Sequence, residues 1–523
     1  MSFCYYPAEE SKPVKKLIVI LLLITLKSLS AEARDVNFKG RNGDSLSSAG
    51  VNDSILVYRK YFDFEIWLFK HAKYKILYKD GSYSTGIWAV GLKGIELIKD
   101  GLSSTSQKQL SFITYEELGV KVDVEETDIP ISTFRTLQLM PDRESYAFSD
   151  EILLDLKNDN SEIKYDLVSW ALSNIGEYNT LLCIWDTGEY CNQMKAGSED
   201  LKSFNRTLSP RDSLYFSKFK PYDALKYISD RTKEERVVII NEAHQQPLHR
   251  VFTESLLQEF YDNGFRYFGA ETLGYFDSKL NQRKYPILSS GTYTVEPQYG
   301  NLVRSALRIG YHVFQYESKS HGNPRQREID QANNIQQVLQ TDSSAKILIH
   351  CGFGHNSESY IGGQFEYAMA GRLQEFTGIN PFTINQVALT ETSSEAFDNP
   401  YFKQIYVDYD AVFIDSVGQI FSINPSAVDM YVYHPRTKWL HGRPDWVFKN
   451  NKIPTPILNH IATDFPCLVF AYLENEDIEN AVPVDIIEIK SKSDDKYLAL
   501  YKGNYIIVVK DKNGKRQEIE ITN

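Results

Sequence analysis

From about residue 220, short apolar runs alternate with longer segments in which apolar residues recur every three or four positions. Val237 to Ile240 form one such run, and residues 247–264 follow with leucine, valine and phenylalanine at helical spacing. The alternation continues to about residue 389. Short apolar runs predict buried strands, and the periodic segments predict amphipathic helices. The pattern predicts an α/β domain over residues 216–450, with a mostly parallel sheet flanked by helices.

The individual elements of this domain can be placed from the same pattern. The predicted strands cover residues 237–241, 265–271, 311–317, 345–352, 382–389 and 411–416. The predicted helices cover residues 221–232, 247–264, 301–310, 325–340 and 362–376. Strands that alternate with helices of this length are typical of β-α-β units, which place the strands parallel.

The pattern changes on both sides of this domain. Before residue 140, aromatic and β-branched residues form short runs that are separated by turn dipeptides such as Asp80-Gly81. This predicts a β-rich N-terminal region, which we extend over residues 34–215. Near the other end, three apolar runs are separated by turns at Gly503-Asn504 and Asn513-Gly514. They predict a small β-sandwich-like module over residues 466–523.

The first residues have the pattern of an export signal. Three lysines, Lys12, Lys15 and Lys16, precede an apolar run at 17–26, and Ala31-x-Ala33 suits cleavage before Arg34. The apolar run is short for a membrane span. We expect a cleavable signal peptide over residues 1–33, a periplasmic or secreted protein, and no stable membrane span after cleavage. An uncleaved anchor is the alternative.

Composition narrows the classes of partner. The chain has 523 residues, of which 42% are hydrophobic and 24% charged, as in folded proteins of several domains. Its net charge is −12, and no long basic run follows the N-terminus. Nucleic acid is therefore excluded as the expected partner, because phosphate binding needs a clustered positive surface. We expect a small-molecule substrate, and the sequence does not specify a protein partner.

Titratable side chains follow four consecutive predicted strands. Because the carboxyl ends of parallel strands share one edge of a sheet, and ligands bind at that edge, we expect these side chains to form one site. Its candidate members are Glu242, His244, Glu271, Glu317, His350 and His355. Glu317 is the weakest of them, because it opens a polar loop.

Neighbouring residues have more than one interpretation. His249 and Arg250 lie in the helix after the first strand, where we expect His249 at the surface and leave the role of Arg250 open. Arg327 opens a later helix, and could pair with the carboxylates, bind an anion or be solvated. His312 begins its strand at the opposite end of the sheet, so we assign it a structural role. His321 is a loop candidate.

Two further features could contribute chemistry. Cys351 follows His350, but alternation places its side chain on the opposite face of the strand, which disfavours a thiol nucleophile. Residues 429–448 place His434, Arg436, His441 and Arg443 among aromatic residues. This segment is either a substrate loop over the site or an ordinary structured connection.

Four motifs occur in one order, "NEAH", "FGAET", "REIDQANNI" and "ILIHCGFGH". Together they resemble the erythromycin-esterase-like superfamily and the related haem-uptake lipoproteins, over about residues 235–360. Asn241 departs from the glycine that many members have there. The resemblance implies a hydrolase in which His244 is the general base that activates water.

The same resemblance implies roles for the other residues. Glu242 or Glu271 would orient the His244 ring, and His350, His355 and Arg327 would hold the carbonyl oxygen and the developing oxyanion. A serine nucleophile is disfavoured, because the chain has no Gly-x-Ser-x-Gly motif.

The hydrolase implied by the resemblance is expected to need no cofactor. Three alternatives to it remain open. Glu242, His244, Glu271, His350 and His355 could instead bind zinc, manganese or iron as a divalent metal site. The haem-uptake relatives suggest an exported protein that binds haem or another ligand without turnover. The third alternative is a scaffold, in which β-modules flank an inactive domain.

Overall fold

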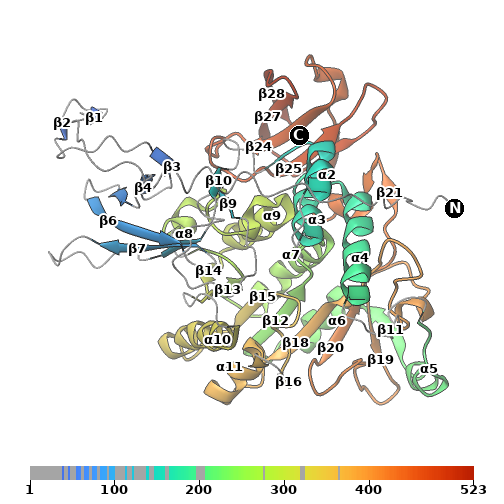
Figure 1. Cartoon of the computed structure of the whole chain (residues 1–523). Helices are drawn as coiled ribbons and strands as arrows, with labels where there is room; N and C mark the ends of the chain where they lie inside the picture. Colours follow the sequence, from blue (N-terminus) through green and yellow to red (C-terminus); the bar gives the residue numbers. More distant parts are fainter. Residues whose placement is uncertain are drawn as a thin grey trace.

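The computed structural model describes residues 146–158, 164–195, 206–274, 277–318, 324–362 and 365–523, together with the backbone of ten short strands before residue 140 (Figure 1). The predicted signal peptide and His321 lie outside these residues. No helix in the described part of the chain is long and apolar enough to cross a membrane.

An eight-stranded sheet forms the centre of the molecule, in the order β11-β19-β20-β18-β12-β15-β13-β14. The strands from β20 to β14 are parallel, and β11 and β19 add an antiparallel edge. Their bounds are Lys220–Asp223 (β11), Val237–Glu242 (β12), Tyr267–Ala270 (β13), His312–Gln315 (β14), Ile347–Gly352 (β15), Phe382–Leu389 (β18), Ala411–Ile414 (β19) and Met430–Tyr433 (β20). The mostly parallel α/β sheet is therefore confirmed.

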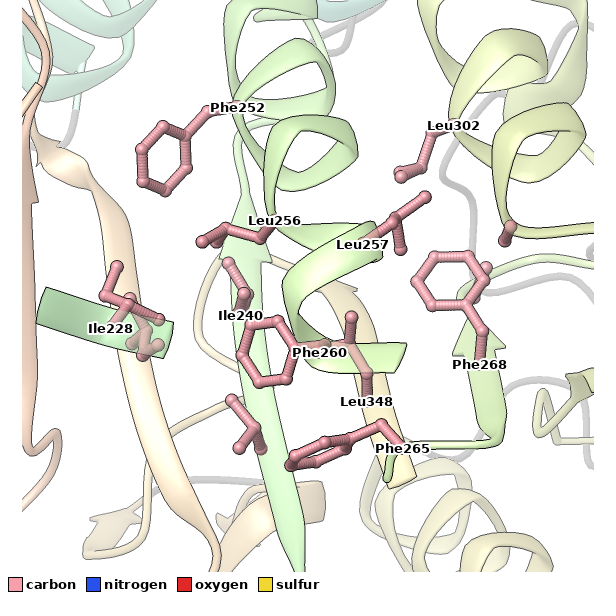
Figure 2. Close-up of a cluster of buried hydrophobic side chains, with 14 of the residues drawn as sticks. Ile228, Ile240, Phe252, Leu256, Leu257, Phe260, Phe265, Phe268, Leu302 and Leu348 are labelled. Atoms are coloured by element: carbon pink, nitrogen blue, oxygen red, sulfur yellow. The ribbon is translucent and has the colours of Figure 1, made fainter. Parts of the chain in front are cut away.

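Helices cover both faces of this sheet. Their bounds are Ala224–Arg231 (α6), Pro247–Asp262 (α7), Leu280–Arg283 (α8), Pro297–Ile309 (α9), Pro324–Thr341 (α10) and Met369–Thr377 (α11). Side chains of α6, α7 and α9 form one buried core with β12, β13 and β15, in which Leu257 and Phe260 face Phe268 and Leu348 (Figure 2). Side chains of α10 and α11 form a second core on the opposite face. Burial on both faces explains why every residue of β12 and β15 is buried.

Several element boundaries differ from the prediction for local reasons. The helix expected at 221–232 starts at Ala224, because residues 220–223 pair with β19 and Asp223 caps the helix. The helix expected at 362–376 starts at Met369, after a small hairpin of Tyr360–Gly362 (β16) and Glu366–Tyr367 (β17). Four short 3-10 turns complete the central part, Tyr293–Val295 (η1), Phe402–Gln404 (η2), Asp445–Phe448 (η3) and Leu458–His460 (η4).

The region before the sheet contains strands followed by helices. Six strands form an antiparallel meander, Ile55–Lys60 (β3), Phe64–Phe69 (β4), Lys73–Tyr78 (β5), Tyr83–Val90 (β6), Gly94–Lys99 (β7) and Phe112–Thr114 (β8). Two short pairs are Phe38–Lys39 (β1) with Ser45–Leu46 (β2), and Val120–Val122 (β9) with Leu137–Leu139 (β10).

The described residues between 146 and 216, in the region expected to be β-rich, are mostly helical. The helices are Ser149–Asn158 (α2), Lys164–Asn174 (α3), Tyr178–Lys195 (α4) and Pro210–Phe216 (α5). Among the described residues of this region, the last strand is therefore β10, which ends at Leu139. Buried residues such as Leu172 and Leu181 pack α2, α3 and α4 against the C-terminal strands.

The C-terminal residues form two small antiparallel sheets. One has the order β25-β24-β27-β28 and the other pairs β23 with β26. Their bounds are Ile453–Pro456 (β23), Cys467–Leu473 (β24), Asp485–Ile489 (β25), Tyr497–Leu500 (β26), Asn504–Asp511 (β27) and Arg516–Thr522 (β28). Asn513 and Gly514 make the turn between β27 and β28, and Gly514 has a φ of +79°. This confirms the expected β-module, although β26 pairs with β23 and not with β27.

Residues 429–448 connect the sheet to this module and do not form a loop over the site. They contribute β20 and a hairpin of Trp439–Leu440 (β21) with Arg443–Pro444 (β22). His434 is fully buried and its Nδ1 lies 2.8 Å from Asp410 Oδ1. Arg443 donates to both oxygens of Asp485 on β25, at 2.8 and 2.9 Å. These buried contacts favour the interpretation of the segment as a structured connection.

Candidate functional site

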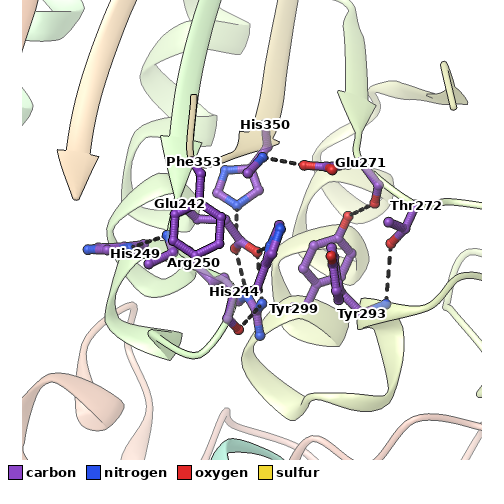
Figure 3. A network of polar contacts seen from close by, with 12 residues as sticks. Glu242, His244, His249, Arg250, Glu271, Thr272, Tyr293, Tyr299, His350 and Phe353 are labelled. Carbon is purple, nitrogen blue, oxygen red and sulfur yellow. Dashed lines mark hydrogen bonds and ion pairs between the residues drawn. The ribbon is translucent and has the colours of Figure 1, made fainter. Parts of the chain in front are cut away.

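Three parallel strands bring the predicted residues to one edge of the sheet. Ile240 on β12 and Ala270 on β13 both pair with His350 on β15. Glu242 therefore ends β12 beside the end of β15, and Glu271 follows β13 at the same level. Figure 3 shows Glu242, His244, Glu271 and His350 gathered at this edge. We call this edge of the sheet the rim.

Glu242 is a buried carboxylate with three partners. Arg250 donates Nε to Oε2 at 2.7 Å and Nη2 to Oε1 at 2.8 Å. His350 Nε2 lies 2.8 Å from Oε2, and His244 Nδ1 lies 3.1 Å from Oε1. Burial opposes ionisation, but the Arg250 guanidinium and the two imidazoles outweigh it and hold the pKa of Glu242 well below its usual range. Glu242 is therefore a fixed negative charge under the rim.

Arg250 joins Glu242 to the start of helix α9. It is fully buried, and its Nη1 donates to Glu296 Oε2 at 2.8 Å. Glu296 also caps α9, because it accepts hydrogen bonds from the backbone N–H groups of Gln298 and Tyr299. Sequence reasoning left Arg250 open and missed Glu296, although the Glu-Pro step at a helix start is a cap signal.

His244 is the imidazole of the rim that solvent reaches, with 22% of its side chain exposed. Its ring stacks on Tyr293, with 4.2 Å between centroids, and meets Phe353 edge-on at 4.9 Å. Since Nδ1 faces the Glu242 carboxylate, it carries a proton and Nε2 is left as the basic nitrogen. No described residue hydrogen-bonds Nε2.

Gly352 makes room for this ring. A Cβ built on Gly352 would overlap His244 Cε1, and would lie 2.5 Å from His244 Nε2 and 2.8 Å from Glu271 Oε2. The same point in space is therefore bordered by the free nitrogen of His244 and by a carboxylate oxygen of Glu271. Any larger residue would displace one of the two.

Glu271 lies between two groups of partners. Its Oε2 accepts the backbone N–H of Gly352, on the side of His244, and its Oε1 accepts Arg327 Nη2 at 2.7 Å. Burial opposes ionisation of Glu271, but His355 and Arg327 outweigh it and lower its pKa to about 2. Tyr299 fixes the backbone by donating its hydroxyl to the carbonyl of Glu271.

Arg327, from the first turn of α10, forms the second half of the site. It donates Nε and Nη2 to the two oxygens of Glu317, at 2.8 and 2.7 Å, and Nη1 to His355 Nε2 at 2.9 Å. With the bond to Glu271, four of its five N–H groups are engaged. No described residue accepts the second N–H of Nη1. Glu317, the weakest candidate from sequence, is thus one wall of the site.

His355 is held by a carboxylate that the sequence analysis did not single out. Its Nδ1 lies 2.9 Å from Glu328 Oε2, and Glu328 also accepts the backbone N–H of Met369 at 2.6 Å. Burial disfavours the charged imidazole, but the carboxylates of Glu271 and Glu328 outweigh it and raise the pKa of His355. The acidic residue next to Arg327 in "REIDQ" was the available signal.

His350 and His249 lie below the rim and do not reach solvent. Only 1% of the His350 side chain is exposed, and its Nε2 faces Glu242. It therefore supports Glu242, and the structure gives it no path to a substrate oxygen. His249 is fully buried, so the expectation of a surface residue is wrong. Helix α7 buries its first turn because strand β20 and the loop after β18 cover it.

Cys351 and His312 lie where the sequence analysis placed them. Cys351 is buried in the core under α10 and α11, on the face opposite His350, and burial raises the pKa of its thiol well above the usual value. His312 begins β14 and lines a surface hollow of about 410 Å³ with Tyr267, Phe314 and Glu317. Neither residue contributes to the rim.

The carboxylates of the rim do not fit a divalent metal in this arrangement. Both oxygens of Glu242 accept hydrogen bonds from Arg250, and those of Glu271 accept hydrogen bonds from Arg327 and Gly352. Among the described residues, no group of three His, Cys, Asp or Glu side chains is arranged to hold a metal ion. Two guanidinium groups, from Arg250 and Arg327, provide the positive charge of the site.

Comparisons with known proteins leave the family of this chain open. No protein-family model and no curated protein matches it. Two solved structures are similar over part of it. The type III effector HopBA1 is 11% identical over 42% of this chain and 96% of its own, with a TM-score of 0.27. RRSP, a MARTX toxin effector domain from Vibrio vulnificus CMCP6, is 15% identical over 54% of this chain and 59% of its own, with a TM-score of 0.25. Likenesses this weak carry no argument about function.

Proposed function

We propose that this protein is an exported hydrolase of the erythromycin-esterase-like type, in which His244 activates a water molecule to attack an ester or a related carbonyl. The observation that carries the proposal is the state of the His244 ring. Its Nδ1 is held 3.1 Å from an ionised, buried Glu242, while its Nε2 has no hydrogen-bond partner among the described residues and lies close to Gly352 and Glu271. This is the geometry of a general base with a carboxylate that orients it.

The reaction can be written from these groups. Nε2 of His244 takes a proton from water while the water oxygen bonds to the carbonyl carbon, and the carbonyl oxygen becomes an oxyanion. The protonated His244 then gives its proton to the leaving alkoxide as the carbon–oxygen bond breaks. Glu242 stabilises the imidazolium that exists between these two steps.

Arg327 supports the oxyanion part of the proposal. No described residue accepts its second Nη1 N–H, and its guanidinium lies on the opposite side of the Glu271 carboxylate from His244. A substrate carbonyl over Glu271 would thus lie between a base and a fixed donor. His355, whose Nε2 accepts the other Nη1 N–H at 2.9 Å, would hold the guanidinium in place and would not itself donate to the oxyanion. His350 has no place in it, because Glu242 engages it below the rim.

The test is ester hydrolysis across a broad panel of substrates by the purified protein. His244→Ala is expected to abolish turnover, and His312→Ala, which removes an exposed imidazole at the start of β14, at the opposite end of the sheet, is the matched control. Each protein is assayed with and without chelator. Turnover that requires His244 and resists chelator supports the proposal. Loss of turnover with chelator would replace it with the metal-dependent alternative.

A ligand-binding protein without turnover is distinguished in the same samples. Haem addition, followed by absorbance near the Soret band, reports an imidazole–iron complex directly. A shifted band in the wild-type protein that His244→Ala removes, together with no hydrolysis, would contradict the hydrolase and favour the binding alternative. If neither hydrolysis nor a Soret shift is observed, the scaffold with an inactive domain is the alternative that remains.

A further inference from the structure

The turn that carries His244 is held from below by His249. The backbone N–H of Ala243, between Glu242 and His244, donates to His249 Nδ1 at 3.0 Å. His249 is fully buried in the first turn of α7. Its neighbour Arg250 donates to the carbonyl of His244 at 2.7 Å. Two adjacent residues of one helix therefore grip the backbone of the same short turn.

The hydrogen bonds around His249 run in one direction only. Because Nδ1 accepts the Ala243 N–H, the ring proton must be on Nε2, which lies 2.9 Å from Thr390 Oγ1. The Thr390 hydroxyl in turn donates to the carbonyl of Gln386 at 2.6 Å. Each member is a donor to the next one, from the Ala243 amide to the strand β18.

A second branch returns from β18 to the rim. Gln386 donates its backbone N–H to Asn241 Oδ1 and its side-chain amide to the Asn241 carbonyl, each at 2.8 Å. Asn241 Nδ2 donates to the carbonyl of Phe353 at 2.6 Å. Phe353 is the ring that meets His244 edge-on. The network thus ties the ends of β12, β15 and β18 around one imidazole.

We propose that His249 is a positioning residue, which acts as a neutral Nε2–H imidazole and fixes the backbone turn that aims His244. The role rests on the proposed hydrolase function of the same rim. A protonated His249 would turn an N–H toward the Ala243 N–H, and the turn would lose its support. His249 must therefore be neutral at every pH at which His244 acts as the general base.

The surroundings of His249 favour this neutral state. Burial lowers its pKa well below the usual value, and the nearby rings of His434 and His350 and the Arg250 guanidinium act in the same direction. Glu242 alone opposes them. His434, whose ring centroid lies 5.6 Å away, is itself held by Asp410, which Lys449 also contacts.

The test compares two substitutions at Thr390. Thr390→Val removes the acceptor of the His249 proton, and Thr390→Ser keeps it. The matched control is Thr232→Val, because Thr232 is also buried and donates its hydroxyl to a backbone carbonyl four residues earlier, that of Ile228. We expect Thr390→Val to lower kcat on the order of 10-fold to 100-fold with little change in KM, since it misaligns a base and leaves binding groups in place. Thr390→Ser and Thr232→Val should stay near wild type.

Two readouts do not depend on catalysis. Hydrogen exchange at the Ala243 amide should be slow in wild type and in Thr390→Ser, and at least about 10-fold faster in Thr390→Val. Nitrogen-15 NMR of labelled histidine should show His249 protonated at Nε2 alone between about pH 5.5 and pH 8.5. If Thr390→Val does not fold, His249→Asn, whose Oδ1 can replace Nδ1 as acceptor for Ala243, provides the same exchange test and should keep the amide protected.

The outcomes separate this proposal from the hydrolase proposal. Unchanged Ala243 exchange in Thr390→Val, or a doubly protonated His249 near neutral pH, would overturn the positioning role whatever the activity. Unchanged kcat beside faster exchange would also overturn it, because the turn would then move without consequence. If no substrate is hydrolysed by wild type, the hydrolase proposal fails, and exchange and NMR still decide whether His249 holds the turn.

Discussion

Arg250 and Glu242 form a doubly hydrogen-bonded ion pair at the floor of the rim, with 0% and 1% of their side chains exposed. The same guanidinium also contacts Glu296. Charges so deeply buried are tolerated only when they are fully paired, so each partner depends on the others. The pair fixes Glu242 as an ionised group, which in turn fixes the tautomer of His244.

Replacing Arg250 should destabilise the whole protein. Arg250→Met would leave two buried carboxylates without a counter-charge, and removing one partner of such a pair costs about 3–5 kcal/mol of unfolding free energy. Urea unfolding followed by circular dichroism measures it. The matched control is Arg325→Met, because Arg325 pairs with Glu366 at the surface, with 51% of its side chain exposed. That variant should be indistinguishable from wild type, and equal losses for both would contradict the argument.

Gly352 and Gly354 offer a matched pair of substitutions two residues apart. Gly352→Ala places a methyl group against His244 Cε1 and 2.5 Å from Nε2, so the ring must move. A shift of about 1 Å in a catalytic group costs on the order of 100-fold in rate. Gly354→Ala meets no atom within 4 Å and should keep the activity. Steady-state kinetics on the best ester of the panel checks this, and similar activity in both variants would argue against His244 as the base.

Glu358 should make the protein less stable at alkaline pH. Burial and then the neighbouring Asp429 carboxylate raise the pKa of Glu358 to about 7, while Thr383 donates to it at 2.6 Å. A carboxyl group with a raised folded pKa contributes stability below its unfolded value, near 4.5, and loses it as pH rises through about 7.

Glu358→Gln tests this sign, because the amide stays neutral. We expect the variant to resemble wild type near pH 5 and to be more stable than wild type near pH 8. Thermal unfolding at the two pH values measures the difference. Glu395→Gln, at an exposed position, is the control and should show no such crossover. A stability difference that does not depend on pH would rule out the raised pKa of Glu358 as its cause.

Glu271 should make the protein less stable at acid pH. Its pKa is lowered to about 2, so its contribution to stability is present above the unfolded value of 4.5 and is lost as pH falls toward 2. The stability lost in Glu271→Gln should therefore be greatest near pH 7 and should shrink as the solution is acidified. Chemical unfolding of both proteins between about pH 7 and pH 3 gives this difference directly. A loss that is constant over this range would mean that hydrogen bonding, and not charge, is what Glu271 contributes.

The strand ends were the part of the site that the sequence could predict. Alternating apolar runs and periodic segments located five of the six parallel strands, and the rule that parallel strands end at one edge then brought Glu242, Glu271 and His350 together. Strand β20 was missed because its four residues, 430–433, look like part of an aromatic loop. Only the tertiary fold inserts it between β18 and β19.

What the sequence could not predict was the depth of each side chain. His249 looked like a surface residue of an amphipathic helix, yet β20 and the loop after β18 cover that turn of α7. His350 looked like an oxyanion donor, yet Glu242 engages it below the rim. Periodicity describes one element at a time, and these roles depend on what a second element packs against it.

The fork of Arg327 gives the most specific prediction about catalysis. Arg327→Lys keeps one positive charge but replaces five N–H groups in a plane by three on one nitrogen. The lysine could not contact Glu317, Glu271 and His355 together and still have an N–H left for the substrate. We expect kcat/KM to fall on the order of 100-fold, as when one oxyanion donor is removed. Arg372→Lys is the control, since Arg372 makes comparable pairs with Glu366 and Glu375 away from the rim. Because Arg327 keeps 33% of its side chain exposed, its replacement should affect the unfolding free energy less than replacing the buried Arg250. If Arg327→Lys lowers the unfolding free energy but the folded variant keeps the wild-type kcat/KM, Arg327 contributes to stability and not to catalysis.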